Sequence, residues 1–260
     1  MPPVNVQAIV LRRRPLSEAD KVLTLFTREM GKVSAIAKGA RKPTSKLAGA
    51  TETCVRARFH LAQGKTFWIV TQASVERARA RLHRLLVNAT AAIYACELVD
   101  CLLEENVPDE ELFELLSNTL DALETSDHPM WTLCLLENAV LLQQGYAPVL
   151  ETCTRCAKPV DGEKIGFQPG SGGVLCASCA RAENPVVMLS RLAWLTWRVV
   201  NAGGEAHFPG EAAAVELERA VHLHLRYHLD REMKSTQVIW QLRQELSGGE
   251  VCGEGVSFMP

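Results

Sequence analysis

Residues 53–61 read Thr-Cys-Val-Arg-Ala-Arg-Phe-His-Leu, and this segment sets the architecture expected for the front of the chain. Apolar and polar residues alternate along it. A period of two is typical of a strand with one buried and one outward face. The segment therefore predicts a half-buried β-strand with a basic outer side. The inward set is Val55, Ala57, Phe59 and Leu61. The outward set is Cys54, Arg56, Arg58 and His60.

Strand patterns surround this segment on both sides. Tight turns are expected at Glu29–Lys32, where Gly31 supplies a positive φ, and at Gln63–Lys65. Five short strands with such turns in about 80 residues favour a small closed barrel of the OB type over residues 1–80. The other four predicted strands are Val6–Leu11, Lys21–Thr27, Val33–Ala37 and Thr66–Thr71.

The apolar period then becomes helical, which predicts an α-helical domain over residues 81–152 and 181–246. Residues 247–260 are glycine-rich and are expected to form a flexible tail. The chain is thus expected to be an α+β multidomain protein. The predicted helices are Val75 to Glu105, Pro108 to Leu123, Pro129 to Gln144, Leu189 to Val200, Glu211 to Asp230 and Ser235 to Leu246.

Two Cys-x-x-Cys pairs interrupt the helical region, with nineteen residues between them. Four thiolates suit tetrahedral Zn²⁺ and leave no open position for a substrate, so the predicted site is structural. We expect an inserted zinc module over residues 153–180, with short strands at 164–167 and 173–175. The other cysteines fit buried thiols in a reducing compartment rather than a disulfide framework. The predicted ligands are Cys153, Cys156, Cys176 and Cys179.

The net charge of −2 hides a strong asymmetry along the chain. Residues 1–84 hold 17 of the 28 Lys and Arg but 5 of the 30 Asp and Glu, a net +12, which leaves −14 for residues 85–260. A basic block of this size points to a polyanionic partner, with a solvated basic face as the alternative.

The basic residues of this block are grouped, and together they predict a groove that follows a phosphate backbone. Lys38, Arg41, Lys42 and Lys46 lie in one loop, and Arg12–Arg14 end the first strand. Arg77, Arg81 and Arg84 are spaced for one helix face. Candidates for base stacking are His60, Phe67 and Trp68. The candidate nucleic-acid-binding residues are Lys38, Arg41, Lys42, Lys46, Arg56, Arg58, Arg77, Arg81 and Arg84.

Several catalytic classes do not fit the chain. Gly64-Lys65-Thr66 lacks the earlier glycine of a phosphate-binding loop, and no His-x-Glu precedes either cysteine pair as in zinc deaminases. His222, His224 and His228 lack the glutamate of a metalloprotease motif and are expected to be ordinary histidines. No membrane span or secretory signal is evident, so a cytoplasmic location is expected. None of these motifs predicts a particular enzyme class.

The chain resembles the RecO family of bacterial recombination mediators. The resemblance rests on Ala8–Leu11, Ser17–Asp20, Leu25–Thr27 with Gly31-Lys32, and Ala37–Arg41 with Ser45–Leu47, together with the order of barrel, helices and inserted cysteine module. It implies a protein that binds single- and double-stranded DNA without sequence preference and anneals complementary strands. It also implies a location at the nucleoid and a role that makes or breaks no covalent bond, so the chain is not expected to be an enzyme.

The resemblance further implies that the protein acts with RecR to load RecA onto DNA covered by the single-strand binding protein SSB. The acidic tail of SSB would bind the helical domain, with Arg191, Arg198 and Arg226 as possible rim residues. The residues alone leave two alternatives, an RNA-binding OB protein with zinc and a zinc-dependent nucleic-acid enzyme.

Overall fold

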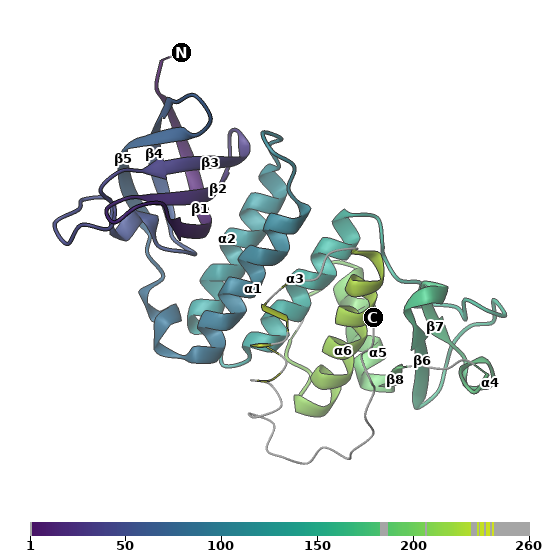
Figure 1. The fold of residues 1–260 in the computed structure, drawn as a ribbon. Helices are drawn as coiled ribbons and strands as arrows, with labels where there is room; N and C mark the ends of the chain where they lie inside the picture. Colours follow the sequence, from purple (N-terminus) through teal and green to yellow (C-terminus); the bar gives the residue numbers. More distant parts are fainter. Residues whose placement is uncertain are drawn as a thin grey trace.

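The computed structural model describes residues 2–182, 187–205 and 207–229, and positions 233, 235, 236, 238, 239 and 241. A β-barrel lies at one end, helices form the middle, and a small β-sheet lies at the other end (Figure 1). The predicted combination of an OB-like barrel, a helical region and a cysteine module is confirmed. The predicted helix at 235–246 lies largely outside the described residues, and the predicted tail at 247–260 lies wholly outside them.

Five strands close the barrel in the order β1-β2-β3-β5-β4, and β3 with β5 is its parallel pair. Gly31 ends the turn between β2 and β3 as the first residue of β3, and its φ is +69°, as the sequence predicted. The alternation at residues 55–61 is also confirmed, because Ala57, Phe59 and Leu61 are fully buried. The strands are β1 (Val4–Pro15), β2 (Lys21–Thr27), β3 (Gly31–Ala37), β4 (Arg56–Gln63) and β5 (Trp68–Arg77).

Strand β1 is buried on both of its faces. Val6, Ala8 and Val10 point into the barrel core. Ile9 and Leu11 belong instead to the core of the helical region. A strand covered on both faces needs a continuous apolar run rather than an alternating one, which explains the sequence from Ala8 to Leu11. The barrel is therefore packed against the helices.

The prediction of one helix from Val75 to Glu105 is wrong for its first part. Strand β5 continues to Arg77 because Val75 and Arg77 pair with β4, and a 3₁₀ helix η2 (Ala80–Arg84) follows. The long helix α1 begins only at Leu86 and ends at Leu102. Helix α2 begins one residue after Asp109, whose side chain accepts a hydrogen bond from the Leu112 amide. The remaining long helices are α2 (Glu110–Thr125), α3 (Pro129–Gln143), α5 (Arg191–Asn201) and α6 (Glu211–His228).

The cysteine module contains the two predicted strands and a third that the sequence did not suggest. Strands β6 (Lys164–Gln168) and β7 (Gly173–Leu175) flank the short helix η3 (Pro169–Ser171), and the one-turn helix α4 (Ala177–Ala180) follows. Strand β8 (Val187–Ser190) pairs with the other edge of β6. Helix α5 therefore begins at Arg191 rather than Leu189. In the barrel, η1 (Gly49–Thr51) interrupts the loop between β3 and β4.

Candidate nucleic-acid interface and metal centre

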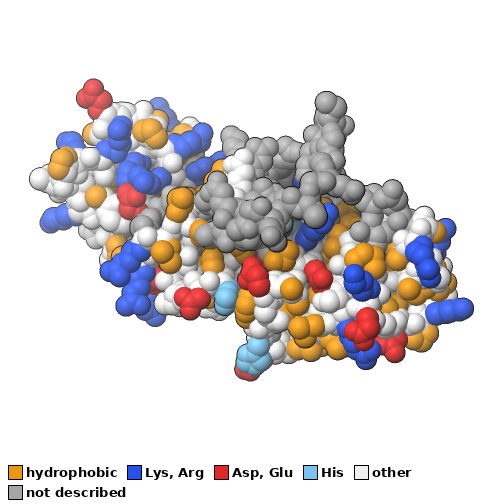
Figure 2. Space-filling view, turned by 90° about the horizontal axis from the view of Figure 1, so that it is seen from below, with side chains coloured by type: hydrophobic (Ala, Val, Ile, Leu, Met, Phe, Trp, Pro, Cys, Tyr) orange, Lys and Arg blue, Asp and Glu red, His pale blue; other side chains and the backbone are white. Residues whose placement is uncertain are grey.

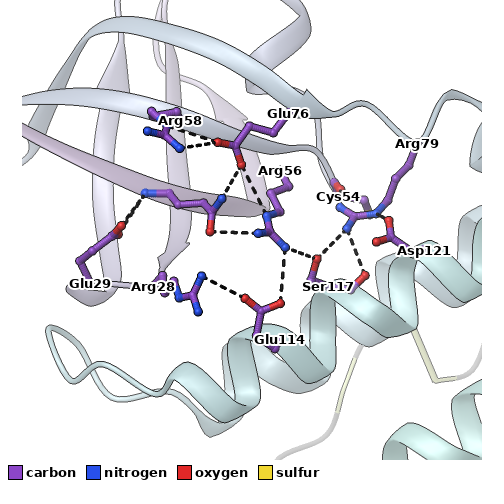
Figure 3. Close-up of polar contacts among 11 residues, drawn as sticks. Arg28, Glu29, Cys54, Arg56, Arg58, Glu76, Arg79, Glu114, Ser117 and Asp121 are labelled. Atoms are coloured by element: carbon purple, nitrogen blue, oxygen red, sulfur yellow. Dashed lines mark hydrogen bonds and ion pairs between the residues drawn. The ribbon is translucent and has the colours of Figure 1, made fainter.

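The side of the barrel that faces the helices holds its cations in ion pairs (Figure 3). Arg79 is almost fully buried, and its Nε lies 2.7 Å from Asp121 Oδ1 on α2. The same guanidinium donates to the carbonyl oxygens of Cys54 and Ser117, at 2.8 and 3.0 Å. Arg28 pairs with Glu110 and Glu114 of α2. These arginines bind the barrel to α2.

Two predicted DNA-binding residues belong to this network. Arg56 donates to Ser117 Oγ at 2.9 Å, pairs with Glu114 and lies over the Phe113 ring. Arg58 is more exposed, but its Nε and Nη2 lie 3.2 and 3.1 Å from Glu76 Oε1. A carboxylate already occupies the donors of each arginine. The structure therefore places Arg56 and Arg58 among neutralised cations rather than free ones.

Asp100 of α1 binds two further cations of the barrel. Its carboxylate lies 3.0 Å from Arg12 and 3.3 Å from Lys32. Eight of the 17 basic residues in residues 1–84 have a carboxylate partner, and five of the eight use an acid of α1 or α2. Part of the charge asymmetry thus arises because the barrel faces an acidic helical surface. The eight are Arg12, Arg13, Lys21, Arg28, Lys32, Arg56, Arg58 and Arg79.

The other nine basic residues make no ion pair within the described part of the chain, and all of them are exposed. Seven of these nine are predicted DNA-binding residues. Arg77, Arg81 and Arg84 do not share a helix face, because Arg77 ends β5 and the other two lie in η2. Figure 2 shows Lys and Arg side chains over the barrel lobe. The nine are Arg14, Lys38, Arg41, Lys42, Lys46, Lys65, Arg77, Arg81 and Arg84.

An open cleft of about 450 Å³ lies where the β1–β2 end of the barrel meets the loop between β3 and β4. Among the described residues, no carboxylate lines it. Lys21 starts β2 opposite Pro15, and Arg41 donates from the loop to the carbonyl oxygen of Ser17. Sequence reasoning found Arg13, Arg14 and Arg41 but missed Lys21 and Thr53, whose place depends on the strand pairing. The lining residues are Arg13, Arg14, Pro15, Lys21, Arg41 and Thr53.

The stacking candidates are placed differently from one another. Trp68 packs against the barrel core, so its ring is committed to folding. Phe67 and His60 are half-buried. A ring must present an open face to stack on a base. His60 and Phe67 therefore remain the better candidates, and neither lines the cleft.

The four predicted metal ligands converge in space. Their Sγ atoms all lie within 4.8 Å of one another, and those of Cys156 and Cys176 are 3.8 Å apart. A Zn–S length of about 2.3 Å gives a tetrahedron whose edge is about 3.8 Å. Four sulfur donors at this spacing fit a four-coordinate soft metal. In the described residues, no other cluster of three or more such side chains is placed to hold an ion.

Local hydrogen bonds prepare one of these thiols for a metal. The Ser178 hydroxyl and the Cys179 amide lower the pKa of Cys176 to about 6. Cys179 is hydrogen-bonded to Cys176, which raises the pKa of Cys179 to about 12, so Cys179 keeps its proton until a metal replaces it. Binding by thiolates is coupled to proton release.

The histidines and candidate rim arginines of the helical region make internal contacts. His222 lies 2.9 Å from Glu137 in the core, and His224 Nε2 lies 3.0 Å from the carbonyl oxygen of Tyr146. Arg191 pairs with Asp161, and Arg198 pairs with Glu151. His222 and His224 are thus held by contacts within the helical region.

Comparison with known protein families identifies the family of this chain. The family model described as "Recombination protein O N terminal" matches residues 1–79, and the model described as "Recombination protein O C terminal" matches residues 83–237. The chain belongs to the RecO family. It is similar to "DNA repair protein RecO" of Symbiobacterium thermophilum, with 34% identity over 92% of this chain and 97% of the relative. The RecO protein of Pelotomaculum thermopropionicum is also 34% identical, over 94% and 96%.

These names describe a DNA repair protein and a recombination protein, and they name no catalytic activity. RecO of a Roseiflexus species has the same name and is 33% identical over 97% of this chain. In the described residues, no helix has the length and apolar character needed to cross a membrane.

Proposed function

We propose that this RecO chain binds single- and double-stranded DNA through the loop end of its barrel, without sequence preference. The observation that carries the proposal is the cleft lined by Arg13, Arg14, Lys21 and Arg41, with no carboxylate in its wall. Lysine and arginine bind backbone phosphates whatever the base sequence. The exposed loop cations Lys38, Lys42 and Lys46 extend the basic surface beside the cleft.

Bound in this way, two complementary strands would have their phosphate charge screened, so the protein would anneal them without breaking a bond. We further propose that it acts in the cytoplasm at the nucleoid and, with RecR, helps load RecA onto DNA covered by SSB. The relatives named as DNA repair proteins support a role of this kind. The acidic tail of SSB is the expected ligand of the helical region.

The cysteine centre is proposed to bind one structural Zn²⁺ through Cys153, Cys156, Cys176 and Cys179. When bound, zinc would cross-link the two ends of the module and supply folding free energy. The four sulfur ligands leave no position for substrate, which argues against the alternative of a zinc-dependent nucleic-acid enzyme.

The DNA proposal is tested by titrating labelled oligonucleotides at several salt concentrations. We expect binding to weaken with salt, with a log–log slope of about −0.7 per phosphate contact on single strands. The variant R14Q/R41Q removes two cleft charges and should flatten the slope, whereas K158Q/K164Q removes two exposed charges of the cysteine module and should not. Absence of binding in dilute buffer would refute the proposal, and preferential binding of a matched RNA would favour the RNA alternative.

The mediator role is tested by strand annealing with SSB-coated complementary oligonucleotides. Addition of the protein should raise the annealing rate and leave both strands intact. R14Q/R41Q should lose much of this effect. A shortened strand would instead identify a nuclease.

The zinc proposal is tested by metal analysis of the purified chain. We expect one zinc per chain, loss of that zinc in Cys156→Ser, and retention in the control Cys101→Ser, because Cys101 is not in the cluster. Acid protonates the thiolates, and the bound metal competes with those protons, so zinc should be retained at neutral pH and dissociate in acid. A metal content that Cys156→Ser leaves unchanged would contradict the site.

A further inference from the structure

The cleft has a carboxylate beside it that contacts two of its four cations. Glu52 follows η1 and precedes the lining residue Thr53. Its Oε1 lies 2.9 Å from Lys21 Nζ, and its Oε2 lies 2.8 Å from Arg13 Nη2. Arg14 and Arg41 have no such partner among the described residues. One internal anion therefore contacts two of the four cations and offsets one of their four positive charges.

The two contacts of Glu52 differ in what they do for the protein. The Lys21 side chain is only 8% exposed and also donates to Thr51 Oγ1 at 3.1 Å. A buried ammonium group needs a counter-charge and hydrogen bonds, so this contact is structural. The Arg13 side chain is 44% exposed and can leave Glu52 for another acceptor. Arginine binds carboxylate and phosphate with the same fork of donors.

We infer that Glu52 is an internal competitor of the backbone phosphate and sets how tightly the cleft holds a strand. This inference rests on the proposed function. A phosphate that enters the cleft has to take Arg13 from Glu52 and lie close to the remaining carboxylate charge. Both effects weaken binding, which lets a bound strand leave the cleft when its complement arrives.

The test compares two variants that remove one negative charge from the same end of the barrel. Glu52→Gln keeps the side-chain size and an acceptor for Lys21 but releases Arg13. The control Glu18→Gln changes an exposed residue of the β1–β2 turn that contacts no cation in the described structure. With labelled oligothymidylate, E52Q should bind about three- to tenfold more tightly than wild type, and its salt slope should steepen by about 0.7, one more phosphate contact. E18Q should change affinity less than about twofold, with the slope unchanged.

A double variant shows whether the effect passes through Arg13. In an Arg13→Gln background, E52Q should no longer steepen the slope. Circular dichroism checks that E52Q is folded. Should E52Q unfold, Glu52→Asp serves in its place, since it keeps the charge near Lys21 and withdraws it from Arg13. If wild type binds DNA and E52Q changes affinity and slope no more than E18Q does, the role inferred for Glu52 is refuted, while the proposed DNA binding stands. If neither wild type nor E52Q binds in dilute buffer, the proposed function fails as well.

Discussion

The helix-facing side of the barrel and its loop end both carry many cations, yet they use them in different ways. On the helix-facing side, Arg28, Arg56 and Arg79 each meet a carboxylate of α2 or β5 (Figure 3), and Arg12 and Lys32 meet Asp100 of α1. At the loop end, Arg14, Lys38, Arg41, Lys42 and Lys46 meet none in the described structure. The helix-facing side is an interface between the barrel and the helical region of the same chain, whereas the loop end is open to an external anion.

This difference shows that a count of charges cannot name the partner of a basic module. The excess of twelve positive charges in residues 1–84 suggested an external polyanion. Five of those cations instead bind the acidic helices, where an uncompensated charge would be costly. The positive charge available to DNA comes from the cations that do not bind these helices.

The largest expected effect comes from adding a methyl group at Gly31, where the barrel backbone approaches that of Val107 in the helical region. A Cβ on Gly31 would lie 2.0 Å from the carbonyl oxygen of Val107, and Gly31 has a φ of +69°. We expect Gly31→Ala to lower the free energy of unfolding by about 4 kcal/mol, from backbone strain and overlap together. The control Gly39→Ala has a similar φ of +66° but meets only the Lys42 side chain at 3.9 Å.

Gly39→Ala should therefore cost only the strain, about 1 kcal/mol. Urea titrations followed by circular dichroism measure both variants. Equal losses in the two would show that the contact with Val107 contributes nothing, and that the helix-facing side is not a tight interface.

The next effect tests the buried arginine at the centre of that interface. Arg79→Met removes a guanidinium that contacts Asp121, Cys54 and Ser117, and it should cost about 2–3 kcal/mol because two buried carbonyl oxygens lose their donor. Arg77→Met, two residues away and exposed, should cost less than about 0.5 kcal/mol. The same urea titrations decide. A comparable loss in both variants would mean that the ion pairs of the interface are as weak as surface ones.

Sequence patterns predicted what depends on neighbours in the chain. The alternation at residues 55–61 defined β4, and the two Cys-x-x-Cys pairs defined the metal ligands, because each pair is a local unit. The patterns failed where distant segments decide. Strand β5 runs on to Arg77 because β4 pairs with it, and β8 exists because β6 offers a free edge. The prediction that Arg77, Arg81 and Arg84 share one helix face is wrong for the same reason, because the pairing of β5 with β4 keeps Arg77 in a strand.

The candidate binding residues divide in the same way. Exposure of Lys38, Lys42 and Lys46 follows from their acid-free loop. No local signal showed that Arg56 would meet Glu114, which lies 58 positions later in the sequence. No local signal predicted that Lys21 and Thr53 would line the same cleft. These relations depend on how the barrel packs and pairs its strands.

A third and smaller effect compares a paired cation with an unpaired one in DNA binding. Arg58→Gln and Arg77→Gln each remove one charge from neighbouring strands. Glu76 already neutralises Arg58, whereas Arg77 has no carboxylate partner in the described residues. We expect R77Q to reduce the salt slope by about 0.7 and R58Q by less than half as much. The opposite order, measured with the same oligonucleotide, would show that the ion pair with Glu76 opens when DNA binds.

The smallest effect concerns Glu76 itself, which holds Arg58 and Arg56 on the barrel surface. Burial opposes its ionisation, but hydrogen bonds from Gln7 and Arg58 and the charges of both arginines outweigh it, so the pKa of Glu76 falls below its ordinary 4.5. A carboxyl group with a lowered pKa stabilises the fold above pH 4.5, and this contribution is lost as the pH falls through the lowered pKa. Because Arg58 is 60% exposed, Glu76→Gln should cost no more than about 1 kcal/mol at neutral pH. The difference from wild type should shrink towards zero in acid, whereas Glu18→Gln should show no such trend. Urea titrations across this pH range provide the measurement, and a pH-independent difference would mean that Glu76 acts through shape rather than charge.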